Sequence, residues 1–124
     1  MSESSIKSHR DLIAWQKAMN LTEKVYDLAR SFPKEEIYGL TSQIRRCAVS
    51  IPANIAEGQG RRSKKEFQQF LGHARGSLLE LDTHLELALR FGYISSESYQ
   101  NILPQLQEVG RILNGLLRSL DEKY

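Results

Sequence analysis

The chain has 124 residues, close to the usual size of one domain; 40% of them are hydrophobic and 26% are charged. This balance excludes a disordered chain, and the longest apolar run, Leu12 to Trp15, is too short for a membrane-spanning helix of about 20 residues. Residues 1–10 lack a signal peptide's apolar segment and Cys47 is the single cysteine, so we expect a cytoplasmic protein without disulfides.

The composition also favours helices, since 17 Leu and 8 Ala stand against 3 Val and 3 Thr. Periodic apolar residues predict four helices in residues 11–121, which we take as one domain after a disordered tail over residues 1–10. The first helix is expected from an N-cap at Asp11 to Ser31, with Pro33 ending it. Its expected buried stripe comprises Leu12, Trp15, Met19, Thr22, Tyr26 and Ala29.

The second helix is expected to begin within residues 34–41 and to end at Gly58 in the left-handed conformation. Pro52 lies inside it and predicts a kink or break, because the proline ring clashes with the carbonyl four residues earlier. Ser50 and Asn54 are available to satisfy the freed backbone groups. Its apolar positions are Leu40, Ile44, Cys47, Ala48, Ile51 and Ile55.

The third helix begins at a predicted capping box of Ser63 and Glu66 and runs to Gly92. Its heptad seam comprises Phe67, Leu71, Ala74, Leu78, Leu81, Leu85 and Ala88. The fourth starts near Ser95 or Ser96, with Pro104 expected to distort it. Its apolar positions are Tyr99, Ile102, Leu106, Val109, Leu113, Leu116 and Leu120. Short connections between four amphipathic helices predict an all-α, antiparallel up-down four-helix bundle.

A second stripe of small and apolar residues follows an adjoining face of the third helix. It comprises Gly72, Gly76, Leu79, Thr83 and Leu87. Because a glycine inside a helix costs about 1 kcal/mol relative to alanine, close approach of another helix would explain the pair. That helix belongs either to the same bundle or to a second copy of the chain, and Gly110 and Gly115 raise the same two alternatives.

Residues suited to catalysis are few. Cys47 falls on an apolar stripe, where burial makes a thiol a poor nucleophile. His73 and His84 lie about 16 Å apart along their helix and cannot share one metal ion. Glu80 and His84 are one turn apart, but the sequence lacks the Glu-x-x-His pattern of di-metal bundles, so we expect a solvated polar face there. The sequence predicts no enzyme, no cofactor and no metal site.

The positive charge is concentrated in the middle of the chain. Residues 45–75 carry seven basic and two acidic side chains, although the net charge of the whole chain is only +2. The turn before the third helix holds Arg61, Arg62, Lys64 and Lys65, preceded by Arg45 and Arg46. A helix N-terminus with a glycine-containing turn and guanidinium groups is suited to phosphates, so these six residues are the candidate nucleic-acid contacts. The alternative is an ordinary solvated basic surface.

Residues 38–46 (YGLTSQIRR) and residues 50–58 (SIPANIAEG) carry a family resemblance. Together with further matching segments, they resemble the four-helix bundle proteins encoded by 23S ribosomal RNA intervening sequences. The further segments are Asp11-Leu12, Trp15-Gln16-Lys17, Phe67 to Leu71, Gly76-Ser77-Leu78, Glu80-Leu81 and Gly92-Tyr93-Ile94.

The resemblance implies a bacterial, cytoplasmic homopentamer. It also implies a relationship to the accessory variability determinant of diversity-generating retroelements, a basic pentameric barrel thought to bind nucleic acid and a reverse transcriptase. Two hypotheses follow for this chain. The first is a non-enzymatic homo-oligomer that binds nucleic-acid phosphates through its basic turn. The second is a scaffold or adaptor for protein partners, for example a reverse transcriptase, without direct nucleic-acid binding.

Overall fold

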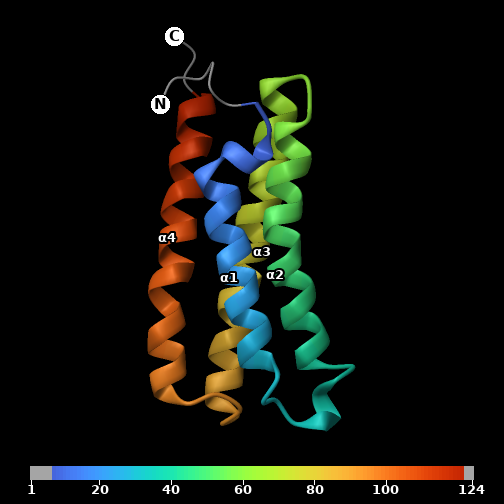
Figure 1. Ribbon diagram of the computed structural model, residues 1–124, viewed down its shortest axis with the longest axis vertical. Helices are drawn as coiled ribbons and strands as arrows, with labels where there is room; N and C mark the ends of the chain where they lie inside the picture. The colour runs from blue at the N-terminus through green and yellow to red at the C-terminus, as the bar shows by residue number, and fades with distance from the viewer. Residues whose placement is uncertain (1–6, 122–124) are drawn as a thin grey trace.

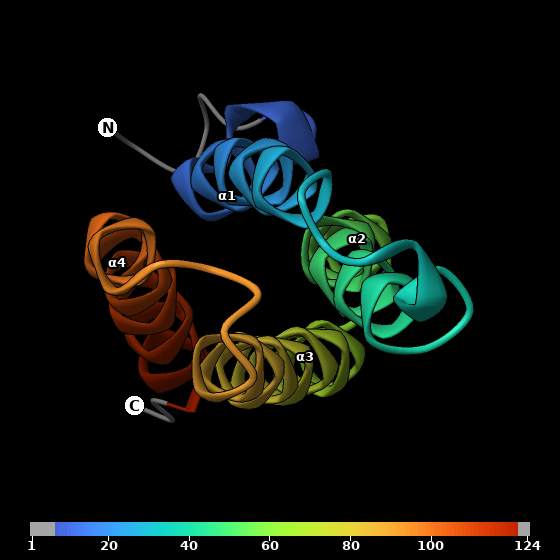
Figure 2. The same ribbon diagram turned by 90° about the horizontal axis from the view of Figure 1, so that it is seen from below.

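Four long helices run alternately up and down the molecule in chain order (Figure 1). The computed structural model describes residues 7–121, and the helices are α1 (Ile13–Ala29), α2 (Leu40–Gln59), α3 (Lys64–Arg90) and α4 (Ser96–Asp121). Viewed along the bundle, each helix neighbours the next, and α4 also packs against α1 (Figure 2). The predicted all-α up-down four-helix bundle is confirmed.

Two short 3-10 helices, η2 (His9–Asp11) and η3 (Lys34–Glu36), precede α1 and α2. The Ser8 side chain caps η2 by accepting a hydrogen bond from the Arg10 N–H at 3.1 Å. Asp11 is the last residue of η2. It is not the predicted N-cap of α1, because that position is occupied by Leu12. Residues 1–6 of the disordered tail expected over residues 1–10 lie outside the described residues. At His9 and Arg10 the expectation is wrong, because both belong to η2.

The buried face of α1 differs from the predicted stripe. Its buried residues are Ala14, Ala18, Leu21, Val25 and Ala29. Met19 and Tyr26, both expected in the core, are 38% and 37% exposed. The two stripes are adjacent on the helix, and the structure buries the one with small alanines, which allow α1 to lie close to its neighbours. The larger side chains of Met19 and Tyr26 lie beside the buried face of α1, where solvent reaches them.

Of the kink or break expected at Pro52, the break is wrong, because α2 is one helix from Leu40 to Gln59. Proline has no N–H to donate to the carbonyl oxygen of Ala48, four residues earlier. The Thr22 hydroxyl of α1, which lies 2.8 Å from the Ala18 carbonyl oxygen of its own helix, also lies 3.1 Å from the Ala48 oxygen and can donate its single proton to either. The side chain of Asn54 donates instead to the Ser50 carbonyl at 2.8 Å. A neighbouring helix therefore offers a donor to the carbonyl that the proline leaves free. The α4 helix likewise continues through Pro104.

The glycine expected to end α2 has a different role. Gly58 is buried inside the helix, and the chain leaves α2 at Gly60 with an ordinary helical φ of −79°. A Cβ atom built on Gly58 would lie 2.7 Å from Phe70 Cβ of α3. Gly92 does fulfil its predicted role: its φ of +79° ends α3, and the Tyr93 N–H returns to the Ala88 carbonyl at 2.8 Å.

The core lies along the seams predicted for the last three helices. The third helix buries Leu71, Ala74, Leu78, Leu81, Leu85 and Ala88, and the fourth buries Ile102, Leu106, Val109 and Leu113. Phe67, Tyr99, Leu116 and Leu120 are only partly buried at the ends of these seams. The central heptads therefore predict the core well, and the seam residues near the helix ends are partly exposed to solvent.

The Glu36 side chain joins the two loops at the lower end of the bundle. One carboxylate oxygen accepts the Leu40 N–H at the start of α2 at 3.0 Å. The other accepts the Tyr93 hydroxyl from the α3–α4 loop at 2.7 Å. These two hydrogen bonds lower the pKa of the Glu36 carboxyl, and the hydrogen bond between Tyr93 and Glu36 raises the pKa of Tyr93.

We expect Glu36→Gln to lower the stability of the protein at neutral pH. Because the folded-state pKa of Glu36 is lowered, its stabilisation is fully present above the unfolded-state pKa and is lost as pH falls through the folded-state pKa. Urea unfolding at pH 7 and at about pH 3 measures this. The gap in urea midpoint between the parent and Glu36→Gln should narrow at the lower pH. Glu35→Gln, next to it and exposed, is the control; an equal loss in both variants would contradict the prediction.

Candidate nucleic-acid interface

The turn between α2 and α3 lies at the upper end of the bundle (Figure 1). Ser63 caps α3, and its hydroxyl oxygen accepts the Glu66 N–H at 3.1 Å. The predicted capping box forms only in this half, because the Glu66 carboxylate accepts the Ser63 hydroxyl at 3.4 Å rather than the Ser63 N–H. The cap fixes where α3 begins and so places Lys64 and Lys65 in its first turn.

Four of the six predicted basic residues gather around this turn, and we call Arg61, Arg62, Lys64 and Lys65 the turn cluster. All four are exposed. Arg61 forms an ion pair with Glu57 at 2.7 Å, and its guanidinium lies 4.7 Å from the ring centroid of Phe70. Within residues 7–121, the other three members have no ion pair. The turn cluster therefore presents three uncompensated cations and one compensated cation.

The other two predicted residues lie elsewhere. Arg45 and Arg46 are in the lower part of α2, roughly 20 Å along the helix from its end at Gln59. The Arg45 guanidinium lies 5.1 Å from the ring centroid of Tyr26, and its Nε is buried without a hydrogen-bond partner among the described residues. Arg46 is exposed. The structure therefore does not bring the six residues together in one chain.

The fold brings basic residues that are distant in the sequence to the upper end of the bundle. The half of the bundle around the α2–α3 turn comprises residues 7–21, 49–77 and 109–121, and it carries ten Lys and Arg side chains against four carboxylates. The other half carries six against nine. Lys7, Arg10 and Arg118 belong to the basic half because η2 and the end of α4 lie there (Figure 1). The bundle is thus electrostatically polar along its axis.

The second stripe of α3 faces away from the core. No atom of the described chain outside their own helix backbone lies within 4 Å of a Cβ built on Gly72 or Gly76, and Leu79 is 59% exposed. The glycines therefore accommodate no neighbouring helix of the same chain. Gly110 differs, because its Cβ would lie 3.4 Å from Leu78. Gly115 is open like Gly72 and Gly76.

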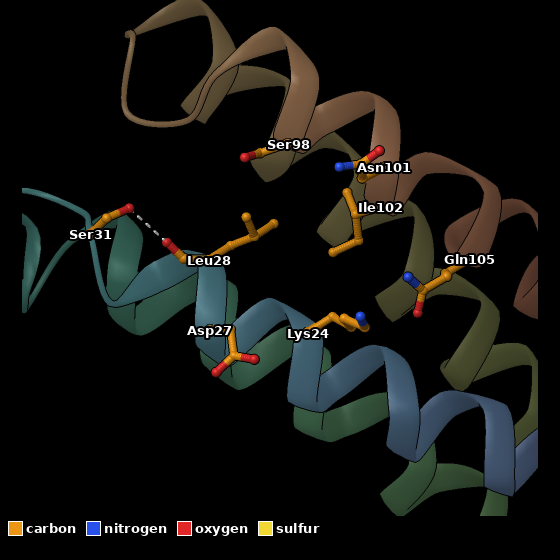
Figure 3. Close-up of a pocket in the computed structure, with 8 residues that line it drawn as sticks. All are labelled: Lys24, Asp27, Leu28, Ser31, Ser98, Asn101, Ile102 and Gln105. Carbon is orange, nitrogen blue, oxygen red and sulfur yellow. Dashed lines mark hydrogen bonds between the residues drawn. The ribbon is translucent and has the colours of Figure 1, made fainter.

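A groove between α1 and α4 lies in the lower half of the bundle, away from the turn cluster (Figure 3). Its volume is about 660 Å³, and it is lined by Lys24, Asp27, Leu28, Ser31, Ser98, Asn101, Ile102 and Gln105. Figure 3 shows Lys24 on α1 extending toward Gln105 on α4, whereas the Asp27 carboxylate points away from α4. Its single cation and single anion do not make it a site for a polyanion.

The structure brings Cys47 of α2 together with Glu80 and His84 of α3, which the sequence did not indicate. Cys47 is 4% exposed, as predicted. Burial and then the negative charge of Glu80 raise the pKa of its thiol to about 11, so it is not a thiolate nucleophile at neutral pH. The expected solvated face is wrong for His84, whose side chain is only 18% exposed.

Comparison with known proteins assigns the chain to a family. The family model described as 23S rRNA-intervening sequence protein matches residues 10–115. The chain belongs to this family. The resemblance seen in residues 38–46 and 50–58 is thereby confirmed at the level of the family. No curated protein matches the chain.

A solved structure has a fold similar to that of this 23S rRNA-intervening sequence family member. It is the crystal structure of a protein with unknown function from the S23 ribosomal protein family of Bacteroides thetaiotaomicron. The match has a TM-score of 0.79 at 25% sequence identity and covers 86% of this chain and 99% of that chain. Neither comparison indicates an enzyme family. In the chain from residue 7 to 121, none of the helices has the length and apolar character needed to cross a membrane.

Proposed function

We propose that this protein is a non-enzymatic homo-oligomer, a pentamer by family resemblance, that binds nucleic-acid phosphates through the turn cluster. The observation that carries the proposal is the set of three exposed cations at the start of α3, Arg62, Lys64 and Lys65, that have no carboxylate partner among residues 7–121. Cations in the first turn of a helix face the positive end of the helix dipole and are unfavourable there. A bound polyanion offsets this cost.

The turn also offers neutral donors. Ser63 occupies the Glu66 N–H, but the first N–H groups of α3 precede that hydrogen bond and point toward the turn. Together with the guanidinium of Arg62, they suit the oxygens of a phosphate. Contacts of this kind hold the backbone of a nucleic acid and read little of its base sequence. Repetition of the turn cluster around an oligomer would raise affinity through multivalency.

The exposed stripe of α3 supports assembly. Gly72 and Gly76 leave a shallow strip beside the exposed Leu79, which a helix of another copy can approach closely. A second apolar patch lies on the α1–α2 side, where Met19, Tyr26 and Val49 are 37–45% exposed. Contact between two different patches is heterologous, the type that closes into rings. We propose the α3 stripe, including Thr83 and Leu87, as one side of the subunit interface.

Gly76→Leu tests the interface without disturbing the bundle. Because nothing lies within 4 Å of a Cβ at Gly76, the leucine should fit in the isolated chain but obstruct a neighbour. We expect the parent to have a mass several times 14.2 kDa and the variant to associate on the order of 100-fold more weakly. Multi-angle light scattering at micromolar concentration measures both. Gln100→Leu, at an exposed position of α4, is the control. A monomeric parent, or a variant that still assembles, would refute this interface.

Fluorescence anisotropy with a labelled single-stranded RNA tests phosphate binding. The affinity of the parent should fall steeply between about 50 and about 200 mM salt, since counterion release drives such binding. Absence of saturable binding at the lower salt would remove the nucleic-acid function. Recovery of one defined protein from a nuclease-treated extract by such a non-binding chain would favour the scaffold alternative.

A further inference from the structure

Cys47, Glu80 and His84 form a compact group where α2 packs against α3, below the turn cluster. Their ligand atoms, one sulfur, one carboxylate oxygen and one ring nitrogen, lie within 4.8 Å of one another. Glu80 and His84 are one turn apart on α3 and therefore share a face. Cys47 reaches them from α2. The group includes three different donor types from two helices that the core holds in fixed register.

The imidazole of His84 has unused bonding capacity. Both ring nitrogens are buried and have no hydrogen-bond partner within the described chain. The Glu80 carboxylate oxygen lies 3.6 Å from His84 Nε2, beyond ordinary hydrogen-bond length. Buried polar groups in proteins normally form hydrogen bonds or bind an ion, so the unpaired imidazole of His84 points to a bound ligand. The distance does match the separation of about 3.3–3.8 Å between two ligands of a tetrahedral ion with bonds of about 2.0–2.3 Å.

We propose that Cys47, Glu80 and His84 bind one divalent transition-metal ion of the zinc class. Sulfur, imidazole nitrogen and carboxylate oxygen are the three donors that Zn²⁺ takes in proteins. A thiolate and a carboxylate together balance the charge of the ion. The Glu80 side chain is 55% exposed, so solvent reaches the group from that side and supplies both access and the fourth ligand. The site is separate from the turn cluster, and the proposal does not depend on nucleic-acid binding.

Metal binding requires Cys47 to lose its thiol proton. Without an ion its S–H donates to the Gln43 carbonyl oxygen at 3.1 Å. Metal binding breaks the S–H bond, gives the sulfur electron pair to the ion and releases the proton to solvent. Binding should therefore weaken as the pH falls.

Cobalt(II) titration of the full chain, without a polyhistidine tag and with the thiol kept reduced, tests the proposal. We expect one Co²⁺ per chain, with the absorption of a tetrahedral ion and a thiolate-to-cobalt charge-transfer band, both abolished by Zn²⁺. Cys47→Ala should eliminate the charge-transfer band. His84→Ala should weaken affinity by more than the 10- to 100-fold that loss of an outer-shell partner typically costs.

His73→Ala is the matched control, because His73 is an exposed histidine of the same helix and should leave the titration unchanged. Circular dichroism of each variant establishes that the bundle is folded. Zn²⁺ should also raise the melting temperature of the parent but not that of Cys47→Ala. A parent without a saturable charge-transfer band, or a band that survives Cys47→Ala or His84→Ala in folded protein, would overturn the site.

Discussion

Replacing Gly58 with leucine is expected to lower the free energy of unfolding by about 3 kcal/mol, the upper end of the usual cost of overpacking a core. The backbone of α2 lies so close to α3 at this point that even a Cβ would be 2.7 Å from Phe70 Cβ and 3.3 Å from the Phe67 carbonyl oxygen. Neither atom is the mobile end of a side chain. The two helices must therefore separate, and the packing beside the turn cluster is lost with them.

Gly60 provides a matched control two residues further along. Its φ is −79°, which any residue adopts, and a Cβ there would lie no closer than 3.6 Å to its neighbours. Gly60→Leu should change stability by no more than about 1 kcal/mol, since helix propensity favours leucine. Urea unfolding at one protein concentration measures both variants, because assembly would contribute to the apparent stability. Equal effects at the two glycines would refute the close-packing role of Gly58.

The sequence predicts the long seams of this bundle well because a helix repeats its buried positions. In α3, six of the seven predicted seam residues are buried; the exception is Phe67 in the first turn. The α1 helix offers two adjacent apolar stripes, so periodicity alone does not select between them. The choice depends on the neighbours: Ala14 and Ala18 allow close packing, whereas the larger Met19 and Tyr26 remain at the rim.

Two of the features that sequence reasoning missed, the roles of Pro52 and Gly58, arise between helices. Pro52 is tolerated because Thr22, thirty residues earlier on another helix, can donate to the carbonyl that the proline leaves free. Gly58 is needed because α3 crosses it closely, not because the chain turns there. Spacing along one helix contains no information on either contact.

The same limit applies to the two candidate sites. The turn cluster is local in sequence, and its exposure could be expected from a charged turn at a helix start. Arg45 and Arg46 were predicted to belong to the same site, but α2 places them roughly 20 Å from its end at Gln59. Cys47 joins Glu80 and His84 across the α2–α3 interface. The sequence shows that Glu80 and His84 are one helical turn apart. It does not show that Cys47 lies beside them, because that contact depends on how α2 packs against α3.

Removing the turn cluster is expected to abolish most of the nucleic-acid affinity. In the variant with Arg61, Arg62, Lys64 and Lys65 all changed to alanine, each lost phosphate contact should reduce the salt slope, log Kd against log salt, by about 0.9 for a duplex and about 0.7 for a single strand. Arg61 should contribute least because Glu57 already neutralises it at 2.7 Å. Anisotropy titrations over a range of salt concentrations measure the slope.

The polarity of the bundle supplies the control for this experiment. Lys24, Arg30, Lys34 and Arg90 belong to the acidic half, and their replacement by alanine removes the same formal charge from the chain. If binding depends on a local array at the start of α3, this second variant should retain the parent slope. If binding depends only on net charge, the two variants should weaken equally. Equal weakening, or a turn-cluster variant that binds like the parent, would refute the placement of the phosphate site at the α2–α3 turn, because only position distinguishes the two sets of cations.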